Sequence, residues 1–304
     1  MKANLHLHSL YSDGYPWPEE IAKRAAGLGI EMISLTDHDC MNGVKEFMDA
    51  CKKYKITGIP GVEIDSCNKE NGFWGEILGY FPEGNYQNTL LFTQKLMKDR
   101  QSLMKGLLEN GRIHYKNKKL TLKEMLINKA GSSKYDPEQF CFSKPDLLYL
   151  LRKEKILPED IHYLEYKKLF EQGQVFDISN NLKIAKPNPP TPEEVIEVIK
   201  SDGGYPVLAH PVYVFEMRRN NMDKLADKYR DLFLYMKSIG LWGIEYNYYN
   251  SNTSLFNEQI EKISRQTGFT NFTSGSDDHG QGHEHDTMEN YICDFEGFPN
   301  HLTG

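Results

Sequence analysis

The hydrophobic pattern of the chain opens with a strand over residues 2–9. Neighbouring side chains of a strand point to opposite faces, so His6 and His8 share one face and Leu5 and Leu7 take the other. Apolar stretches of strand length recur along the chain, and apolar residues at helical spacing separate them. This alternation predicts an α/β fold with a mostly parallel sheet and a barrel portion of seven strands. The further strands are expected at residues 31–36, 56–63, 76–81, 205–209, 243–247 and 269–273.

The middle of the chain has a different sequence pattern. Helical patterns dominate there, Lys and Arg are frequent, and no strand ends in His or Asp. We therefore divide the chain into a barrel of residues 1–87 and 187–304 and a helical insertion of residues 88–186 that covers the barrel mouth. Thr191 is expected to cap the helix that leads back into the barrel, with Glu194 completing a capping box.

A metal-capable residue follows or ends most of the predicted strands. In a closed βα barrel the carboxyl ends of the strands meet on one face, where active sites form. His and carboxylate side chains together suit Zn, Mn or Fe, whereas Mg prefers an all-oxygen shell. The pattern therefore predicts a metal site at the barrel mouth.

Composition narrows the setting. The formal net charge of −7 offers no basic surface for a stable nucleic-acid complex. No apolar run has membrane-spanning length, and the first residues lack the apolar core of a signal peptide. The five cysteines are scattered and contain no Cys-x-x-Cys pair, which is typical of free thiols in a reducing cytoplasm. We expect a cytoplasmic protein without a membrane partner and leave its oligomeric state open.

Six motifs stand in an order that resembles the polymerase-and-histidinol-phosphatase (PHP) family. The resemblance spans roughly residues 1–85 and 190–282 and is weak across the insertion. It is closest to the family's stand-alone metal-dependent phosphoesterases, which include nucleoside mono- and bisphosphate phosphatases. The motifs are His6-x-His8, Ser12-Asp13-Gly14, Thr36-Asp37-His38-Asp39, Gly61-Val62-Glu63, Ala209-His210-Pro211 and Ser276-Asp277-Asp278-His279-Gly280.

The resemblance implies a distorted seven-stranded (β/α)7 barrel, similar to a TIM barrel, that binds two or three divalent metal ions. One ion would be held by His6, His8, Glu63 and Asp277. Glu63 would also bridge to a second ion on His210. A third ion would be held by Asp13, His38 and His279.

Three positions depart from the family pattern. Glu76 stands where a histidine usually completes the second metal position, and we expect Glu76 to be a ligand there. Asn252 replaces a histidine of the family, and Lys144-Pro145-Asp146 replaces an Arg-Pro-His motif. Lys144 and Asn252, at two of these positions, are expected to contact the substrate phosphate, and so is Arg100, another cation of the insertion. For the lysine and the arginine, a solvated helix face is the ordinary alternative.

The expected reaction is hydrolysis of a small phosphomonoester or nucleotide by a metal-bound hydroxide. His210 or a coordinated water would protonate the leaving group. Asp37 and Asp39 flank His38, and one of them would orient an imidazole; we place Asp37 among the catalytic residues, while Asp39 equally suits a helix N-cap. Two alternatives remain: hydrolysis of amides or esters on the same metals, and a non-catalytic metal-binding module.

Overall fold

The computed structural model describes residues 1–171, 189–214, 222–246, 254–280, 288–290 and 293–299. The described strands form one sheet in the order β7-β6-β5-β4-β3-β2-β1-β8. Backbone hydrogen bonds nearly close this sheet into a barrel, because the amide of Leu5 donates to Ser274 and the amide of His8 donates to Asp278. The strands are β1 (Lys2–Asn4), β2 (Met32–Leu35), β3 (Thr57–Asn68), β4 (Phe73–Tyr80), β5 (Tyr205–Leu208), β6 (Gly243–Tyr246), β7 (Phe272–Ser274) and β8 (Cys293–Asp294).

The described sheet differs from the prediction in strand count and in strand direction. The two-residue strand β8 adds an eighth member, pairing antiparallel with β1. It is too short to leave a periodic signal. Strands β3 and β4 are longer than predicted and form an antiparallel hairpin, so that β4 also runs antiparallel to β5. The remaining neighbours are parallel, as expected.

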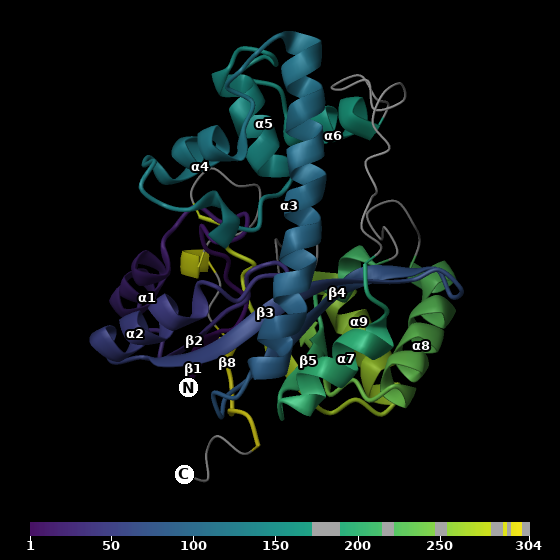
Figure 1. Ribbon diagram of the computed structural model, residues 1–304. Helices are drawn as coiled ribbons and strands as arrows, with labels where there is room; N and C mark the ends of the chain where they lie inside the picture. Colours follow the sequence, from purple (N-terminus) through teal and green to yellow (C-terminus); the bar gives the residue numbers. More distant parts are fainter. Residues whose placement is uncertain (172–188, 215–221, 247–253, 281–287, 291–292, 300–304) are drawn as a thin grey trace.

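Helices cover the outside of the sheet (Figure 1). Thr191 caps α7 through its side chain, and Glu194 completes the capping box as predicted. Among the described residues, no helix is long and apolar enough to cross a membrane. The helices are α1 (Pro18–Gly27), α2 (Val44–Tyr54), α3 (Gln87–Tyr115), α4 (Leu122–Ala130), α5 (Lys144–Lys153), α6 (Tyr163–Glu171), α7 (Pro192–Ser201), α8 (Met222–Ser238) and α9 (Ser254–Gln266).

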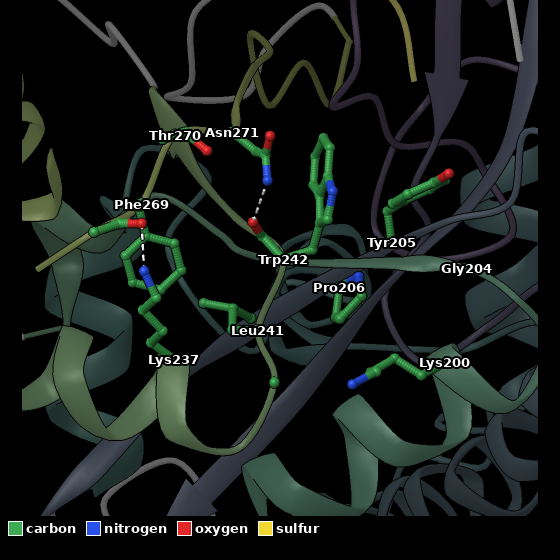
Figure 2. Close-up of a pocket in the computed structure, with 12 residues that line it drawn as sticks. Lys200, Gly204, Tyr205, Pro206, Lys237, Leu241, Trp242, Phe269, Thr270 and Asn271 are labelled. Carbon is green, nitrogen blue, oxygen red and sulfur yellow. Dashed lines mark hydrogen bonds between the residues drawn. The ribbon is translucent and has the colours of Figure 1, made fainter. Parts of the chain in front are cut away.

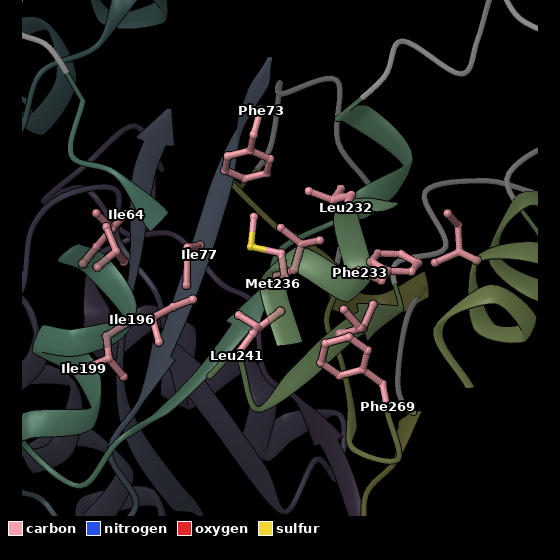
Figure 3. Close-up of a cluster of buried hydrophobic side chains, with 14 of the residues drawn as sticks. Ile64, Phe73, Ile77, Ile196, Ile199, Leu232, Phe233, Met236, Leu241 and Phe269 are labelled. Carbon is pink, nitrogen blue, oxygen red and sulfur yellow. The ribbon is translucent and has the colours of Figure 1, made fainter. Parts of the chain in front are cut away.

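Along the hairpin strands β3 and β4, apolar side chains on one face alternate with charged side chains on the other. Ile64 and Ile77 sit in a buried cluster with residues of α7 and α8, as Figure 3 shows. Their sequence neighbours Glu63 and Glu76 point to the other face, which is the inside of the barrel mouth. A separate apolar cluster that includes Leu5, Leu78 and Val207 fills the barrel below them. Carboxylate side chains therefore line the mouth, and apolar side chains fill the barrel beneath them.

Because β4 runs backwards, the chain leaves the barrel at the end far from the mouth. Tyr80, its last residue, pairs with Tyr205, the first residue of β5. Helix α3 then runs for 29 residues, about 43 Å, alongside the barrel (Figure 1). It brings α4, α5 and α6 to the loop that follows β1, where the amide of Cys141 donates to Tyr11.

Candidate metal centre

All nine residues predicted to bind metal converge at the barrel mouth. They come from the ends of β1, β2, β5 and β7, from the loop after β1 and from the hairpin strands β3 and β4. Together with Asp65 they form four groups, and within each group the ligand atoms lie within 4.8 Å of one another. The groups are His6, His8, Glu63 and Asp277; Glu63, Glu76 and His210; His8, Asp13, His38 and His279; and His38, Asp65 and Glu76.

The first group has the spacing of ligands around one ion. The Nε2 atoms of His6 and His8 lie 3.1 and 3.3 Å from Glu63 Oε2, and 3.3 and 2.9 Å from Asp277 Oδ1. Ligand atoms with bonds of about 2.0–2.2 Å to one ion lie roughly 2.8–3.6 Å apart, from the right angles of an octahedral site to the wider angles of a tetrahedral one. Four donors from three elements therefore surround a space of the size of a metal ion.

Glu63 joins the first group to the second. Its Oε2 faces His6 and His8, while its Oε1 lies 2.9 Å from the Nε2 of His210. That histidine nitrogen is also 3.3 Å from Glu76 Oε2. One carboxylate thus offers an oxygen to each of two neighbouring positions, which is the geometry of a bridging ligand between two metals.

The third group lies on the other side of His8. His279 Nε2 is 3.2 Å from Asp13 Oδ1, and His38 Nε2 is 3.9 Å from Asp13 Oδ2. The Nδ1 of His279 contacts the backbone oxygen of Asp277 at 2.8 Å, so its hydrogen belongs there and Nε2 is left as the ligand atom. This spacing is looser than in the first group.

The polar atoms of the mouth fit cations better than they fit one another. Both ring nitrogens of His8 are buried, and the polar atoms nearest to its Nε2 are the carboxylate oxygens of Asp277 and Glu63, at 2.9 and 3.3 Å. Burial lowers the pKa of His8, but Asp277 and Glu63 outweigh it and raise the pKa to about 10. Burial and the neighbouring Glu63 raise the pKa of Glu76 well above its usual range. A divalent ion in the group of His8 and another in the group of Glu76 would relieve these two unfavourable situations.

Backbone strain is concentrated at the same place. Asp39, His210 and Asp277 have positive φ angles of 46°, 21° and 54°. Such conformations cost on the order of 1–3 kcal/mol for residues with a side chain and persist where surrounding contacts fix them. Gly275 allows the chain after β7 to pass close to His6, because a Cβ at position 275 would lie 2.3 Å from the Cβ of His6.

Asp37 supports the loop that carries Asp13. Its carboxylate accepts hydrogen bonds from the backbone and hydroxyl of Ser9, at 2.7 and 2.6 Å, and from the hydroxyl of Ser12 at 2.6 Å. From α4, the buried ammonium of Lys129 contacts the carbonyl of Ser12 and lies 2.8 Å from Asp146. Asp37 therefore fixes the loop next to the metal-capable residues and is in none of their groups.

The three residues expected to contact the substrate lie in different surroundings. Arg100 pairs with the carboxylates of Asp39 and Asp65 at the edge of the mouth. Asp39 is therefore a partner of Arg100 and not a helix cap; Gly43 occupies the N-cap of α2. Lys144 is exposed at the first turn of α5. Asn252 lies outside the described residues.

Sequence reasoning missed two carboxylates of the mouth. Asp65 lies on the same face of β3 as Glu63, two residues on, and this spacing was the available signal. Glu245 in β6 is fully buried and contacts His6 at 2.8 Å. A lone carboxylate within an otherwise apolar strand was its only mark in the sequence.

A pocket lies at the opposite end of the barrel, before the first residues of β5, β6 and β7 (Figure 2). This pocket of about 480 Å³ contains Lys200, Lys237 and Trp242. The ammonium of Lys237 donates to the carbonyl of Gly268, just beyond α9. Lysine at a helix C-terminus is a structural role, and the pocket is separate from the metal-capable residues.

Comparison with known proteins decides the family. A family model of the PHP domain matches residues 4–176, more than half of the chain. The chain belongs to the PHP family. The resemblance seen in the motifs is thereby confirmed.

Individual proteins are similar to the chain in sequence or in fold. A phosphoribosyl 1,2-cyclic phosphate 1,2-diphosphodiesterase of Eggerthella lenta is 24% identical over 281 residues, covering 92% of this chain and 95% of the relative. A 3',5'-nucleoside bisphosphate phosphatase of Chromobacterium violaceum is 41% identical over 61 residues, 20% of this chain and 21% of that protein. In fold, the chain is similar to a proposed metal-dependent phosphoesterase of Bifidobacterium adolescentis, with a TM-score of 0.68, 22% identity and coverage of 94% and 91%.

Proposed function

We propose that the chain is a metal-dependent phosphoesterase that hydrolyses a small phosphomonoester or a nucleotide with two or three divalent ions. The observation that carries the proposal is the placement of Glu63, whose two oxygens face separate groups of His and carboxylate ligands. Relatives within the PHP family are named for hydrolysis of a cyclic phosphate and of a nucleoside bisphosphate, which supports the same reaction class.

The residues would share the ions as follows. His6, His8, Glu63 and Asp277 would hold the first ion. Glu63, Glu76 and His210 would hold the second, and Asp13, His38 and His279 the third. The chemistry that such ions supply is activation of water and neutralisation of charge on the phosphate oxygens. Mixed nitrogen and carboxylate ligands favour Mn, Fe or Zn.

The side chains beside the mouth disfavour a covalent route in which a serine or cysteine attacks the phosphate. The hydroxyls of Ser9 and Ser12 are committed to Asp37. Burial raises the pKa of the Cys40 thiol, so a thiolate is disfavoured beside the mouth. With His210 Nε2 turned to Glu63 and Glu76, we assign this histidine to metal binding instead of protonation of the leaving group. Direct attack by water is therefore favoured over a covalent intermediate.

A substrate screen with metal control tests the proposal. Chelator-treated protein should lose hydrolysis of phosphate esters, and Mn²⁺ or Zn²⁺ should restore it. The panel should include nucleoside monophosphates, nucleoside bisphosphates and cyclic phosphates beside amides and lactones. Turnover of amides or lactones alone, or full phosphatase activity in the chelator-treated sample, would refute it.

A further inference from the structure

Glu245 is a fully buried carboxylate in β6. Its neighbour Ile244 packs into the outer core, so Glu245 points into the barrel. A carboxylate is costly to bury unless its oxygens are hydrogen-bonded or paired with charge. Its two oxygens contact residues of two different metal-capable groups.

One oxygen faces a ligand of the first set. Glu245 Oε1 lies 2.8 Å from the Nδ1 of His6. A hydrogen on Nδ1 directed at this carboxylate leaves the Nε2 lone pair of His6 pointing at the space between Glu63 and Asp277. Glu245 thus fixes both the tautomer and the ring orientation of His6.

The other oxygen holds the backbone of a ligand of the second set. The amide of His210 donates to Glu245 Oε2 at 2.8 Å. His210 has φ of 21° and ψ of 64°, an unfavourable conformation for a residue with a side chain. Without this acceptor the backbone would be free to relax and would carry the His210 imidazole away from Glu63.

We propose that Glu245 is a positioning residue that couples the two metal positions, because one rigid carboxylate orients His6 in the first and His210 in the second. The inference rests on the proposed function only in requiring that both positions bind ions. Glu63 links the positions directly, and Glu245 forms a second link behind the ligands. Loss of Glu245 should therefore weaken both ions together.

The test is titration of chelator-treated protein with Mn²⁺ and, separately, Zn²⁺, by calorimetry and by metal analysis. Glu245→Gln keeps the size of the side chain, but its NH2 group would face one of the two N–H donors and repel it. The side chain must then turn, and its contact with the other donor is disturbed as well. Both dissociation constants should rise by about 10–100-fold, as expected for a residue that orients metal ligands. Glu258→Gln, on the exposed face of α9, is the matched control and should leave both constants unchanged.

Thermal melts separate positioning from a merely structural role. If Glu245 positions ligands, the gain in Tm on adding metal should shrink in Glu245→Gln, since bound ligand stabilises in proportion to the logarithm of its affinity. An equal loss of Tm with and without metal would overturn the proposal. Weakening of one ion alone, or of neither, would also overturn it.

Glu245→Asp provides a second variant should Glu245→Gln fail to fold. It keeps the charge but is one methylene shorter, so it cannot reach both donors, and it should weaken both ions as well. These measurements use no substrate. Coupled metal binding in a protein that hydrolyses no phosphate ester would support this inference and refute the proposed function.

Discussion

Asp65 and Glu76 face each other directly across the β3–β4 ladder, so two carboxylates occupy one cross-strand pair. Like charges in this arrangement destabilise a sheet. Arg100 pairs with Asp65, and His210 lies 3.3 Å from Glu76. The pair is tolerable because Asp65 has a cation from α3 and Glu76 lies in a group of residues that could hold a metal ion.

Glu76→Gln should lose one bound metal and most activity, because it removes a charged ligand from the second position. Glu76→His should retain the metal and shift preference from Mn or Fe towards Zn, since imidazole is a softer ligand than carboxylate. Metal analysis of the two variants beside the wild type checks both expectations. Identical metal content and preference in all three proteins would show that Glu76 is not a ligand.

His8→Ala should lower turnover by more than about 100-fold while the fold is kept, because His8 belongs to two of the metal-capable groups. Turnover with a phosphate ester and far-ultraviolet circular dichroism provide the measurements. His114→Ala, an exposed histidine near the end of α3, is the control. Near-normal turnover in a folded His8→Ala protein would place the reaction elsewhere.

Arg100→Gln should destabilise the protein by up to about 3–5 kcal/mol, because it leaves Asp39 buried without its cation. Urea unfolding measures this loss, and Arg100→Lys should restore part of it. The original expectation that Arg100 binds substrate makes a different prediction. In that case Arg100→Gln would raise KM with little loss of stability.

Stability of the metal-free protein should depend on pH in a defined direction. Carboxylates raise the pKa of His8 from 6.5 to about 10, so folding favours its protonated form. This contribution is fully present below pH 6.5 and is lost as pH rises towards 10. Urea unfolding with chelator present should show a falling free energy of unfolding over this range. Saturating metal should flatten the dependence, because bound imidazoles carry no such proton.

Lys144→Ala should raise KM or lower kcat/KM by roughly 10-fold if Lys144 reaches the substrate phosphate, as for a charged hydrogen bond of about 1.5–3 kcal/mol. Lys153→Ala, in the last turn of the same helix, is the matched control. Equal kinetics for both variants and the wild type would assign Lys144 to the solvated face of α5.

The sequence was most informative where chemistry coincides with strand ends. His6, His8, His38, Glu63 and His210 could be placed at one barrel mouth because each one ends or follows an apolar strand. This reasoning needs only the rule that the carboxyl ends of parallel strands share a face.

Residues that act through distant partners could not be found in this way. Glu245 is 239 positions from His6, and nothing in either segment indicates that they meet. Asp65 was lost because the predicted strand stopped at Glu63, whereas pairing with β4 extends β3 to Asn68. Lys129 resembled any solvated lysine until the fold placed it against Ser12 and Asp146.

The number of residues in α3 between Thr89 and Arg100 determines where Arg100 lies relative to the barrel mouth. Thr89 is fixed at the far end, where its amide and hydroxyl bind Asp202 at 2.7 and 2.8 Å. Arg100 comes eleven residues later, about three full turns, and so emerges on the same side of the helix to meet Asp39. Adding or deleting one residue between them would rotate Arg100 by about 100° and move it about 1.5 Å along the axis. The spacing between Thr89 and Arg100 is thus constrained in whole turns, because both ends of the segment are held by carboxylates.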